Sequence, residues 1–359
     1  IDNVLLEYSS QNYIAIAYQN DVGIESRFSY QTHGAGRAGT VYISDHTQRL
    51  TLLNTLISSD SDILPFSLSL VYNSSQYGEY FGQPGNRNTN LYSANYSNMK
   101  IGSGWKLSAQ RCVQATRING DDNNTLYWVY TDEDGTEHYF REKDGVFSDE
   151  EGLKLEMELV PEPGHTNYLM TDKIGNQTYF RDGYLTYEKD VYGNSIYYIY
   201  DNASFSAASA DSSTSWMPST STTDKKNQLT AIYRVIKGGT AERLVLLTYN
   251  TNGFLTEIKD EAGRSTYLSP TADAGMTNLP VITYPGGVQA KYFYDTTGLT
   301  RIRDTETDLG YLYEYDPDGT VNKYSRVRYT DDEWGCVTAR IVSCWNGDGN
   351  RSSYRDWGE

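Results

Sequence analysis

Apolar and polar positions alternate in short runs along most of the chain, and turn residues separate the runs. In residues 249–267, turns at Asn250–Gly253 and Asp260–Gly263 enclose a run in which apolar and polar side chains alternate loosely, as in a half-buried strand. Glycine accepts the positive φ that such turns need, and Asn or Asp can hydrogen-bond its own backbone there. The pattern therefore predicts a β-hairpin.

The same unit recurs, as it must, because one such unit cannot bury its apolar face alone. The step from Tyr294 to Tyr315 is 21 residues. Two strands of about 5–6 residues with two short turns have this length, so one repeat corresponds to one hairpin. Further copies or variants occur at Asp172–Asn176, Gly183–Asp201, Asn227–Thr230 (Asn in the Gly place), Tyr294–Asp316, Asp316–Gly319 and Trp345–Asp356 (Trp in the Tyr place).

The remaining segments also predict sheet, with no helix longer than one or two turns. Residues 74–100 and Pro270–Asn278 are expected to be loops, and the Ser/Thr/Ala-rich residues 202–227 a mobile surface insertion. Asp134-Gly135, Asp144-Gly145 and Asp182-Gly183 are hairpin-turn signals. Strands are predicted at Tyr13–Tyr18, Ile24–Tyr30, Val41–Ser44, Leu50–Leu56, Phe66–Tyr72, Trp105–Ile118, Thr125–Tyr130, Leu229–Ile236, Leu244–Tyr249, Val281–Tyr284 and Gln289–Tyr294, the last two pairing around Pro285–Gly287.

The repeated pattern Tyr-Asp-x-x-Gly-x-x-Thr-x-x-x-Asp-x-x-Gly-Asn/Arg resembles the Rhs/YD-repeat family. These are large secreted or surface proteins of bacteria, related to the tyrosine-rich shells of insecticidal toxin complexes and of teneurins. Upstream segments resemble the region that precedes the repeats in Rhs proteins of Gram-positive gut bacteria, and the resemblance covers about residues 20–359. These segments are Gly36–Asp45, Leu64–Asn73, Gly102–Leu107 and Tyr130–Phe140.

The expected fold class is all-β, with antiparallel β-hairpin repeats laid side by side into an extended curved sheet that forms part of a shell or spiral. Three segments are expected. Residues 1–35 read as a strand-rich end of a preceding module, residues 36–170 as the leader β region, and residues 171–359 as the repeat region with its insertion at 202–227.

The composition agrees with an extended sheet and argues against some classes of binding partner. The 33 Tyr against 9 Phe suit strand faces that are partly wet, because the ring packs while the hydroxyl stays hydrogen-bonded. The formal net charge of −17 argues against nucleic acid, which requires a basic footprint, and against anionic membrane surfaces. No run approaches the roughly 18 apolar residues of a membrane span, so no membrane insertion is expected.

The ends and the cysteines add two expectations. The chain begins at Ile1 without a signal peptide, which indicates a fragment of a longer protein, so a secreted or cell-surface location follows only from the resemblance. Three cysteines are too few for a disulfide scaffold. Cys336 and Cys344 could pair across a hairpin, or the three cysteines, Cys112 included, could be buried free thiols.

Candidate chemistry is sparse. None of His33, His46, His138 and His165 has metal-ligand spacing, and no Gly-x-Ser-x-Gly elbow occurs. His138 is expected on the surface. The Gly-rich segment His33–Gly39 precedes a strand where a phosphate loop needs a helix, so we interpret it as a flexible crossing between modules.

Two further possibilities receive little support. Asn346–Asn350 and Asp132–Gly135 superficially match calcium loops, but the first has Cys344 and Arg355 where acids should stand. Carboxylates are abundant, yet nothing singles out a pair for glycoside hydrolysis. The sequence therefore predicts no enzyme, no catalytic residue, no cofactor and no metal site, and leaves any binding residues unknown.

The resemblance implies a structural function: a wall segment of a β-shell that encloses or displays a C-terminal toxin or effector, as in polymorphic toxins. Its partner would be the rest of its own chain, and we expect a monomer. The alternative is a carbohydrate-binding or adhesion module of a bacterial surface or cell-wall protein, with exposed tyrosines stacking on glycans.

Overall fold

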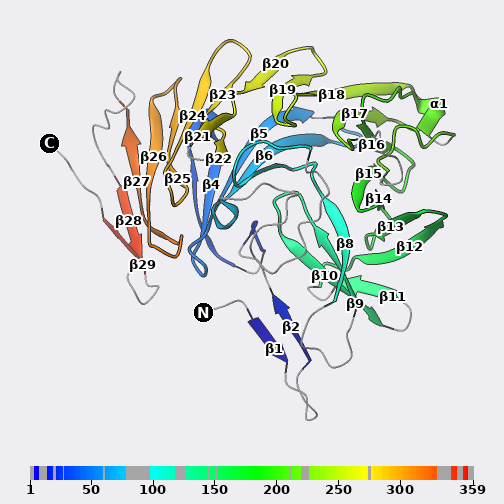
Figure 1. Ribbon diagram of the computed structural model, residues 1–359, viewed down its shortest axis with the longest axis horizontal. Helices are drawn as coiled ribbons and strands as arrows, with labels where there is room; N and C mark the ends of the chain where they lie inside the picture. Colours follow the sequence, from blue (N-terminus) through cyan, green and yellow to red (C-terminus); the bar gives the residue numbers. More distant parts are fainter. Residues whose placement is uncertain are drawn as a thin grey trace.

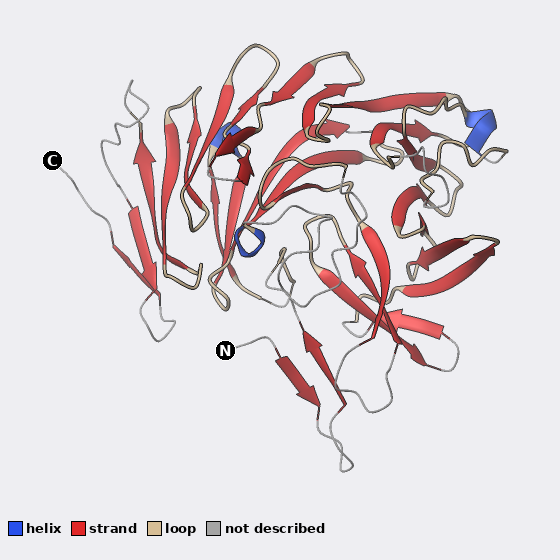
Figure 2. Cartoon of the chain, viewed as in Figure 1, coloured by secondary structure: helices blue, strands red, loops and turns tan. Residues whose placement is uncertain are grey.

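The structure is a computed structural model that describes residues 4–7, 14–18, 22–26, 28–59, 61–77, 98–117, 126–143, 146–149, 152–210, 212–219, 226–273, 276–329, 341–345 and 351–354. Within them the chain is almost entirely antiparallel β-sheet, as the alternating pattern predicts (Figures 1 and 2). The helical elements are short: η1 (Gly36–Ala38), η2 (Ser74–Gln76) and α1 (Ala207–Ala210).

An N-terminal sheet of five strands follows the chain order, each strand pairing antiparallel with the next. The three strands predicted between residues 40 and 73 are confirmed as β4, β5 and β6. The five strands are β3 (Tyr30–Gly34), β4 (Thr40–Ser44), β5 (Leu50–Ser59), β6 (Phe66–Asn73) and β7 (Trp105–Leu107); a separate hairpin joins β1 (Val4–Glu7) to β2 (Ile14–Tyr18).

The second sheet begins as a closed ring of eight strands, β8 to β15. Consecutive strands pair antiparallel, and the pairing of Tyr184 with Cys112 joins β15 back to β8. The ring strands are β8 (Cys112–Arg117), β9 (Leu126–Thr131), β10 (Glu137–Lys143), β11 (Val146–Asp149), β12 (Glu156–Glu162), β13 (His165–Thr171), β14 (Gln177–Arg181) and β15 (Tyr184–Lys189).

From β15 the sheet continues outside the ring as a long curved array, each strand again pairing antiparallel with its neighbour. A small side hairpin, β21 (Thr271–Asp273) with β22 (Met276–Asn278), interrupts it. The array consists of β16 (Ser195–Tyr200), β17 (Leu229–Val235), β18 (Ala241–Tyr249), β19 (Leu255–Asp260), β20 (Ser265–Leu268), β23 (Val281–Thr283), β24 (Gln289–Tyr294), β25 (Leu299–Asp304), β26 (Leu309–Tyr315), β27 (Val321–Arg328), β28 (Ile341–Trp345) and β29 (Arg351–Tyr354).

The long sheet curves around the N-terminal sheet, whose strands lie inside the curve (Figure 1). The two share one hydrophobic core, because inward side chains of both belong to a single buried cluster. Trp105 of β7 packs edge-on against Tyr292 of β24 with ring centroids 5.1 Å apart, and its indole donates to the Tyr294 hydroxyl at 2.8 Å. Each sheet therefore covers the apolar face of the other.

Hairpin turns of one design recur along the second sheet. In each, the N–H of the first residue donates to the carbonyl of the fifth at 2.8–3.0 Å, and the fourth residue is glycine with φ between 79° and 102°. In five of them an Asp or Asn Oδ1 at the first place also accepts the fifth residue's N–H. The turns are Asp132–Thr136, Asp172–Asn176, Asp190–Asn194, Asn250–Phe254, Asp260–Arg264, Tyr284–Val288 and Asp316–Thr320.

Two other turn predictions are confirmed, and a third falls on residues that the structure does not describe. Asp182 and Gly183 both have positive φ, of 52° and 84°, and form a two-residue turn between the paired Arg181 and Tyr184. Asn227 takes the left-handed conformation at φ 52°, as expected of a residue in the glycine place. Asp144-Gly145 falls outside the described residues.

The repeat tyrosines tie together the two paired strands of a hairpin at its open end. Four of them donate a hydroxyl hydrogen bond to a backbone carbonyl 15 to 20 residues upstream, and every accepting residue is a leucine with no exposed surface. We call these contacts the tyrosine bonds. They join Tyr200 to Leu185 at 2.7 Å, Tyr249 to Leu229 at 2.9 Å, Tyr294 to Leu279 at 2.8 Å and Tyr315 to Leu299 at 2.8 Å.

The expectation of a mobile loop at 202–227 is wrong for the part around Trp216. That side chain is fully buried on the outer face of the sheet, where it meets Tyr197 and Phe205. The base of the insertion is also closed, because the Asp201 carboxylate accepts the N–H groups of Asn227 and Gln228 at 3.1 Å. The prediction from the Ser/Thr/Ala-rich composition overlooked the few large apolar residues within this segment.

Two further loop expectations need correction. Pro270–Asn278, expected as a loop, contains the hairpin β21–β22. The segment His33–Gly39, expected as a flexible crossing between modules, is instead the tight end of the β3–β4 hairpin. It packs on the second sheet, with Ala38 fully buried and the Arg37 N–H donating to Asp304 at 3.3 Å. Most of the predicted loop 74–100 lies outside the described residues.

The division into segments 1–35, 36–170 and 171–359 stays a prediction. Sheet pairing runs across both boundaries, since β3 pairs with β4 and β13 pairs with β14. Among the described residues, no helix is long and apolar enough to cross a membrane.

Candidate functional site

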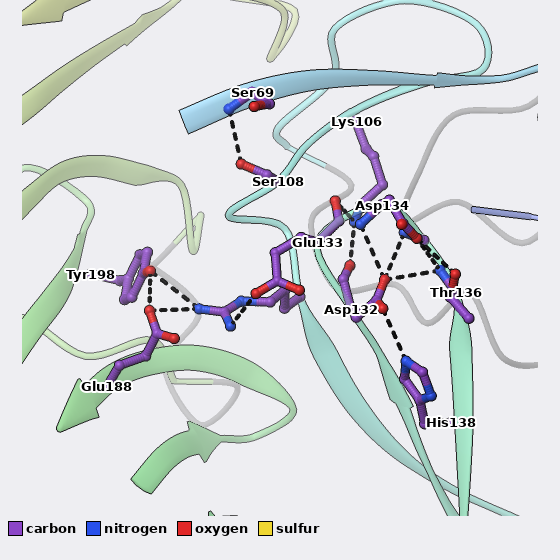
Figure 3. A network of polar contacts seen from close by, with 12 residues as sticks. Ser69, Lys106, Ser108, Asp132, Glu133, Asp134, Thr136, His138, Glu188 and Tyr198 are labelled. Atoms are coloured by element: carbon purple, nitrogen blue, oxygen red, sulfur yellow. Dashed lines mark hydrogen bonds and ion pairs between the residues drawn. The ribbon is translucent and has the colours of Figure 1, made fainter. Parts of the chain in front are cut away.

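The densest polar cluster lies where the N-terminal sheet meets the ring, and Arg111 is at its centre. This residue stands between β7 and β8, and its side chain is 6% exposed. Its guanidinium forms ion pairs with Glu133 at 2.8 Å and Glu188 at 2.7 Å. The Tyr198 hydroxyl donates to the Glu188 carboxylate at 2.6 Å (Figure 3). Three parts of the chain far apart in sequence are thus held by one cation.

A second group of contacts surrounds the β9–β10 turn next to this cluster. The ammonium of Lys106, from β7, donates to the carbonyls of Asp132 and Glu133 at 2.6 and 2.8 Å. The Asp132 carboxylate meets the His138 ring at 2.9 Å and accepts turn N–H groups (Figure 3). Asp134 accepts from the Thr136 hydroxyl at 2.7 Å. The turn is therefore tied to the N-terminal sheet.

Burial and neighbouring charge perturb these groups in different directions. Burial, helped by the Asp132 charge, raises the pKa of Asp134 to about 7, and burial lowers the pKa of the Lys106 ammonium to about 8. Burial also disfavours ionisation of Glu188, but the Arg111 guanidinium outweighs it and holds the pKa of that carboxyl below its usual value. Glu188 is therefore an anion at neutral pH.

Three neighbouring hollows open beside this cluster. The first, of about 360 Å³, is lined by both sheets and includes Arg111, Glu133 and Glu188. The second, of about 320 Å³, shares Leu64 and Glu188 with the first. The third, of about 490 Å³, shares Leu155 and Asp172 with the second. We call the three hollows together the seam groove.

The structure places the four histidines in separate surroundings. His33 lies against Tyr311 and Tyr324, with ring centroids 4.0 and 4.6 Å away, and its Nε2 is hydrogen-bonded to the Tyr313 hydroxyl at 2.9 Å. His46 stacks on Phe28, and His165 meets Asp182 at 2.8 Å. His138, expected on the surface, is only 8% exposed because its ring faces Asp132.

The structure describes only some of the candidate calcium-loop and cysteine residues. Asp132–Gly135 is a hairpin turn whose first carboxylate binds its own backbone. In the part of the chain that the structure describes, no three His, Cys, Asp or Glu side chains gather as a metal site would require. Cys112 is a buried free thiol whose pKa burial raises to about 11. Asn346–Asn350, Cys336 and the side chain of Cys344 lie outside the described part.

A row of tyrosines crosses the outer face of the second sheet. Tyr179, Tyr187, Tyr197 and Tyr233 stand directly opposite one another on β14, β15, β16 and β17. The first two rings stack 4.9 Å apart at 9°, so their faces are turned to each other. Sequence reasoning missed this row, although the tyrosine at matching positions of successive strands was a usable signal.

Glu188 does not have the environment of a general acid, whereas burial raises the pKa of the neighbouring Asp134 to about 7. A general acid needs a carboxyl whose pKa is raised into the working range. Glu188 is held ionised by Arg111, and the same guanidinium engages Glu133. The cluster is suited to joining the two sheets and to presenting charge to the groove.

Comparison with known proteins gives limited help. No family model matches the chain, and no curated protein matches it. Among solved structures, "Crystal Structure of TcdB2-TccC3-Cdc42" matches with a TM-score of 0.32 at 12% identity, over 92% of this chain and 16% of that one. "Crystal Structure of TcdB2-TccC3 without hypervariable C-terminal region" matches with a TM-score of 0.34 at 12% identity, over 88% and 20%.

This chain therefore spans between a sixth and a fifth of the length of the two chains it matches. The TM-scores are too low for either match to carry functional weight.

Proposed function

We propose that this chain is a non-catalytic structural segment of a secreted protein of the Rhs/YD-repeat type. It forms part of a β-shell wall that encloses or displays a C-terminal toxin or effector. The location would be outside the bacterial cell or on its surface, and the main partner would be the rest of the same chain.

The tyrosine bonds are the observation that supports this proposal most directly. The residue that gives the repeat its character, the tyrosine before Asp or Asn, ties the end of one strand to the start of the strand paired with it and so closes the open end of a hairpin. A residue type that recurs for a packing reason indicates a scaffold, because each repeat then supplies the surface that its neighbour needs.

The filled interior also favours a wall. The concave side of the long sheet carries the N-terminal sheet, so the described wall is two sheets thick and shares one core. Each aromatic side chain buried between the layers contributes roughly 1.5–3 kcal/mol. A wall of this kind resists opening without requiring a ligand.

Protease protection in the full-length protein tests the proposal. The region downstream of residue 359 should resist a protease in the native chain. It should become sensitive in a variant in which Tyr200, Tyr249, Tyr294 and Tyr315 are all replaced by Phe. A Tyr192→Phe variant, altered at a side chain that is 75% exposed, is the matched control. Equal sensitivity of the downstream region with and without residues 1–359 would refute a wall that encloses it.

The carbohydrate-binding alternative requires accessible tyrosines, and the candidates are the outer tyrosine row and the separate Tyr192 and Tyr267, which are 75% and 50% exposed. Sugars stack on ring faces, whereas the Tyr179 and Tyr187 faces are turned towards each other. Tyr197 is in turn covered by Phe205 and Trp216 of the insertion. A glycan-array screen separates the two proposals, since a reproducible hit that is lost in a Tyr187→Ala variant would favour adhesion.

A further inference from the structure

The three hollows of the seam groove adjoin one another, because neighbouring hollows share wall residues. Leu64 and Glu188 belong to the first and second hollows, and Leu155 and Asp172 to the second and third. A row of three adjoining hollows, each of several hundred Å³, suits an elongated ligand that crosses all three better than a compact one.

The groove is acidic. Seven carboxyl groups line it against four basic side chains, and burial raises the pKa of one of the seven, Asp134, to about 7. One of the four, Arg111, is already held by Glu133 and Glu188, while the Glu133 side chain remains 58% exposed. Hydrogen bonds from their turns hold the pKa values of Asp172 and Asp190 below the usual range although burial opposes this, so both are ionised at neutral pH.

Apolar side chains lie between these charges. Leu64, Leu155 and Met170 line the middle hollow. The aromatic residues in the groove lining are Phe66 and Tyr198, which are 7% and 3% exposed. The groove therefore presents carboxylates and aliphatic surface, and it offers no open ring face on which a sugar could stack.

We propose that the seam groove binds an extended polypeptide segment rich in lysine or arginine. In an extended strand, alternate side chains point to the same side, so basic residues at every second position all face the carboxylates. Their aliphatic stems cover Leu64 and Leu155 while the charged heads reach the acids. This inference does not depend on the shell function, because it concerns the groove of the chain alone.

The test uses the 359-residue chain and a fluorescein-labelled decapeptide of alternating lysine and alanine, with binding followed by fluorescence anisotropy. Asp172→Asn and Asp190→Asn remove two charges from the groove. The turns should keep their backbone caps, because Asn250 occupies the same turn position and its Oδ1 accepts the N–H groups of the third and fifth turn residues. Each substitution also removes the hydrogen bond that Oδ2 accepts from the Asn176 or Asn194 side-chain amide. Asp260→Asn is the matched control, since Asp260 begins the same kind of turn but does not line the groove.

Saturable, salt-sensitive binding is expected, with a loss of about threefold for each groove variant and about tenfold for the double variant, as for exposed charge pairs. Asp260→Asn should bind as the native chain does, and the matching glutamate–alanine peptide should not bind. Absence of saturable binding would overturn the proposal. An equal loss in Asp260→Asn would show attraction by bulk charge only, and displacement of the peptide by a neutral oligosaccharide would show a glycan site instead.

Discussion

Replacing Tyr200 with phenylalanine tests the tyrosine bonds at their clearest point. The ring is fully buried, and its hydroxyl donates to the Leu185 carbonyl at 2.7 Å. Phenylalanine preserves the ring, and with it the edge-on packing against Tyr184 at 5.9 Å. The substitution therefore removes one hydrogen bond and almost no apolar contact.

The expected loss of stability follows from removing the hydroxyl donor from the Leu185 carbonyl. A buried hydrogen bond contributes about 0.5–1.5 kcal/mol net, and its loss costs more where the surroundings are dry, as they are at Leu185. Tyr200→Phe should therefore lower the free energy of unfolding by roughly 1–2 kcal/mol. The four tyrosines bond to four different leucines, so the fourfold variant should lose roughly 4–8 kcal/mol if the sites are independent. That is a large part of the 5–15 kcal/mol typical of folded domains.

Urea unfolding at pH 7, followed by tryptophan fluorescence, measures these differences. Tyr192→Phe serves as the control and should leave the midpoint unchanged, because that side chain is 75% exposed. If Tyr200→Phe lost no more stability than Tyr192→Phe, the tyrosine bonds would be incidental to the repeat and the reasoning would fail.

Three further predictions concern other parts of the fold. Burial lowers the pKa of His33 from 6.5 to about 3, so as the pH falls the unfolded chain binds the proton before the folded chain does. The His33 contribution to the free energy of unfolding is therefore full above pH 6.5 and is lost as the pH falls towards 3. At pH 5 the free energy of unfolding should be lower by about 2 kcal/mol. Replacing His33 with Phe should remove this part of the pH dependence in urea midpoints, and an unchanged profile would contradict it. Gly263→Ala should lower the free energy of unfolding by about 1 kcal/mol, because φ is +80° and the surroundings are open. Gly310→Ala should lower it several times more, because the added Cβ would collide with the Ile302 carbonyl. Equal shifts of the melting temperature in the two variants would argue against this distinction. Trp216→Ala should cost roughly 3 kcal/mol and speed protease cleavage within residues 203–219, and a cleavage rate equal to the native one would mean that Trp216 does not anchor the insertion.

The hairpins could be predicted from sequence because their causes are local. Asp or Asn at the first turn position, with glycine at the fourth, fixes both the side-chain cap and the positive φ, as at Asp172–Asn176 and Asp260–Arg264. Strand boundaries such as those of β4 and β6 followed from alternation between such turns. The all-β antiparallel fold therefore follows from features that span a few residues each.

The packing of the two sheets could not be predicted in the same way. Asn54 donates to the hydroxyls of Tyr284 and Tyr292 at 2.7 Å, more than 200 residues away in sequence. Arg111 likewise joins Glu133 to Glu188. No turn or alternation pattern marks such partners. Only the folded chain brings them together, so the seam groove had no counterpart in the sequence analysis.

The clamp formed by Asp201 has a consequence for how such proteins diversify. Because the Asp201 carboxylate closes the base of the excursion that leaves at Asn202 and returns at Asn227, β16 and β17 remain paired beside it. Doubling the length of a flexible loop costs only about 0.6 kcal/mol in chain entropy. A longer or different insertion, with a new binding specificity, can therefore be introduced at this point, by evolution or by engineering, without changing which strands pair.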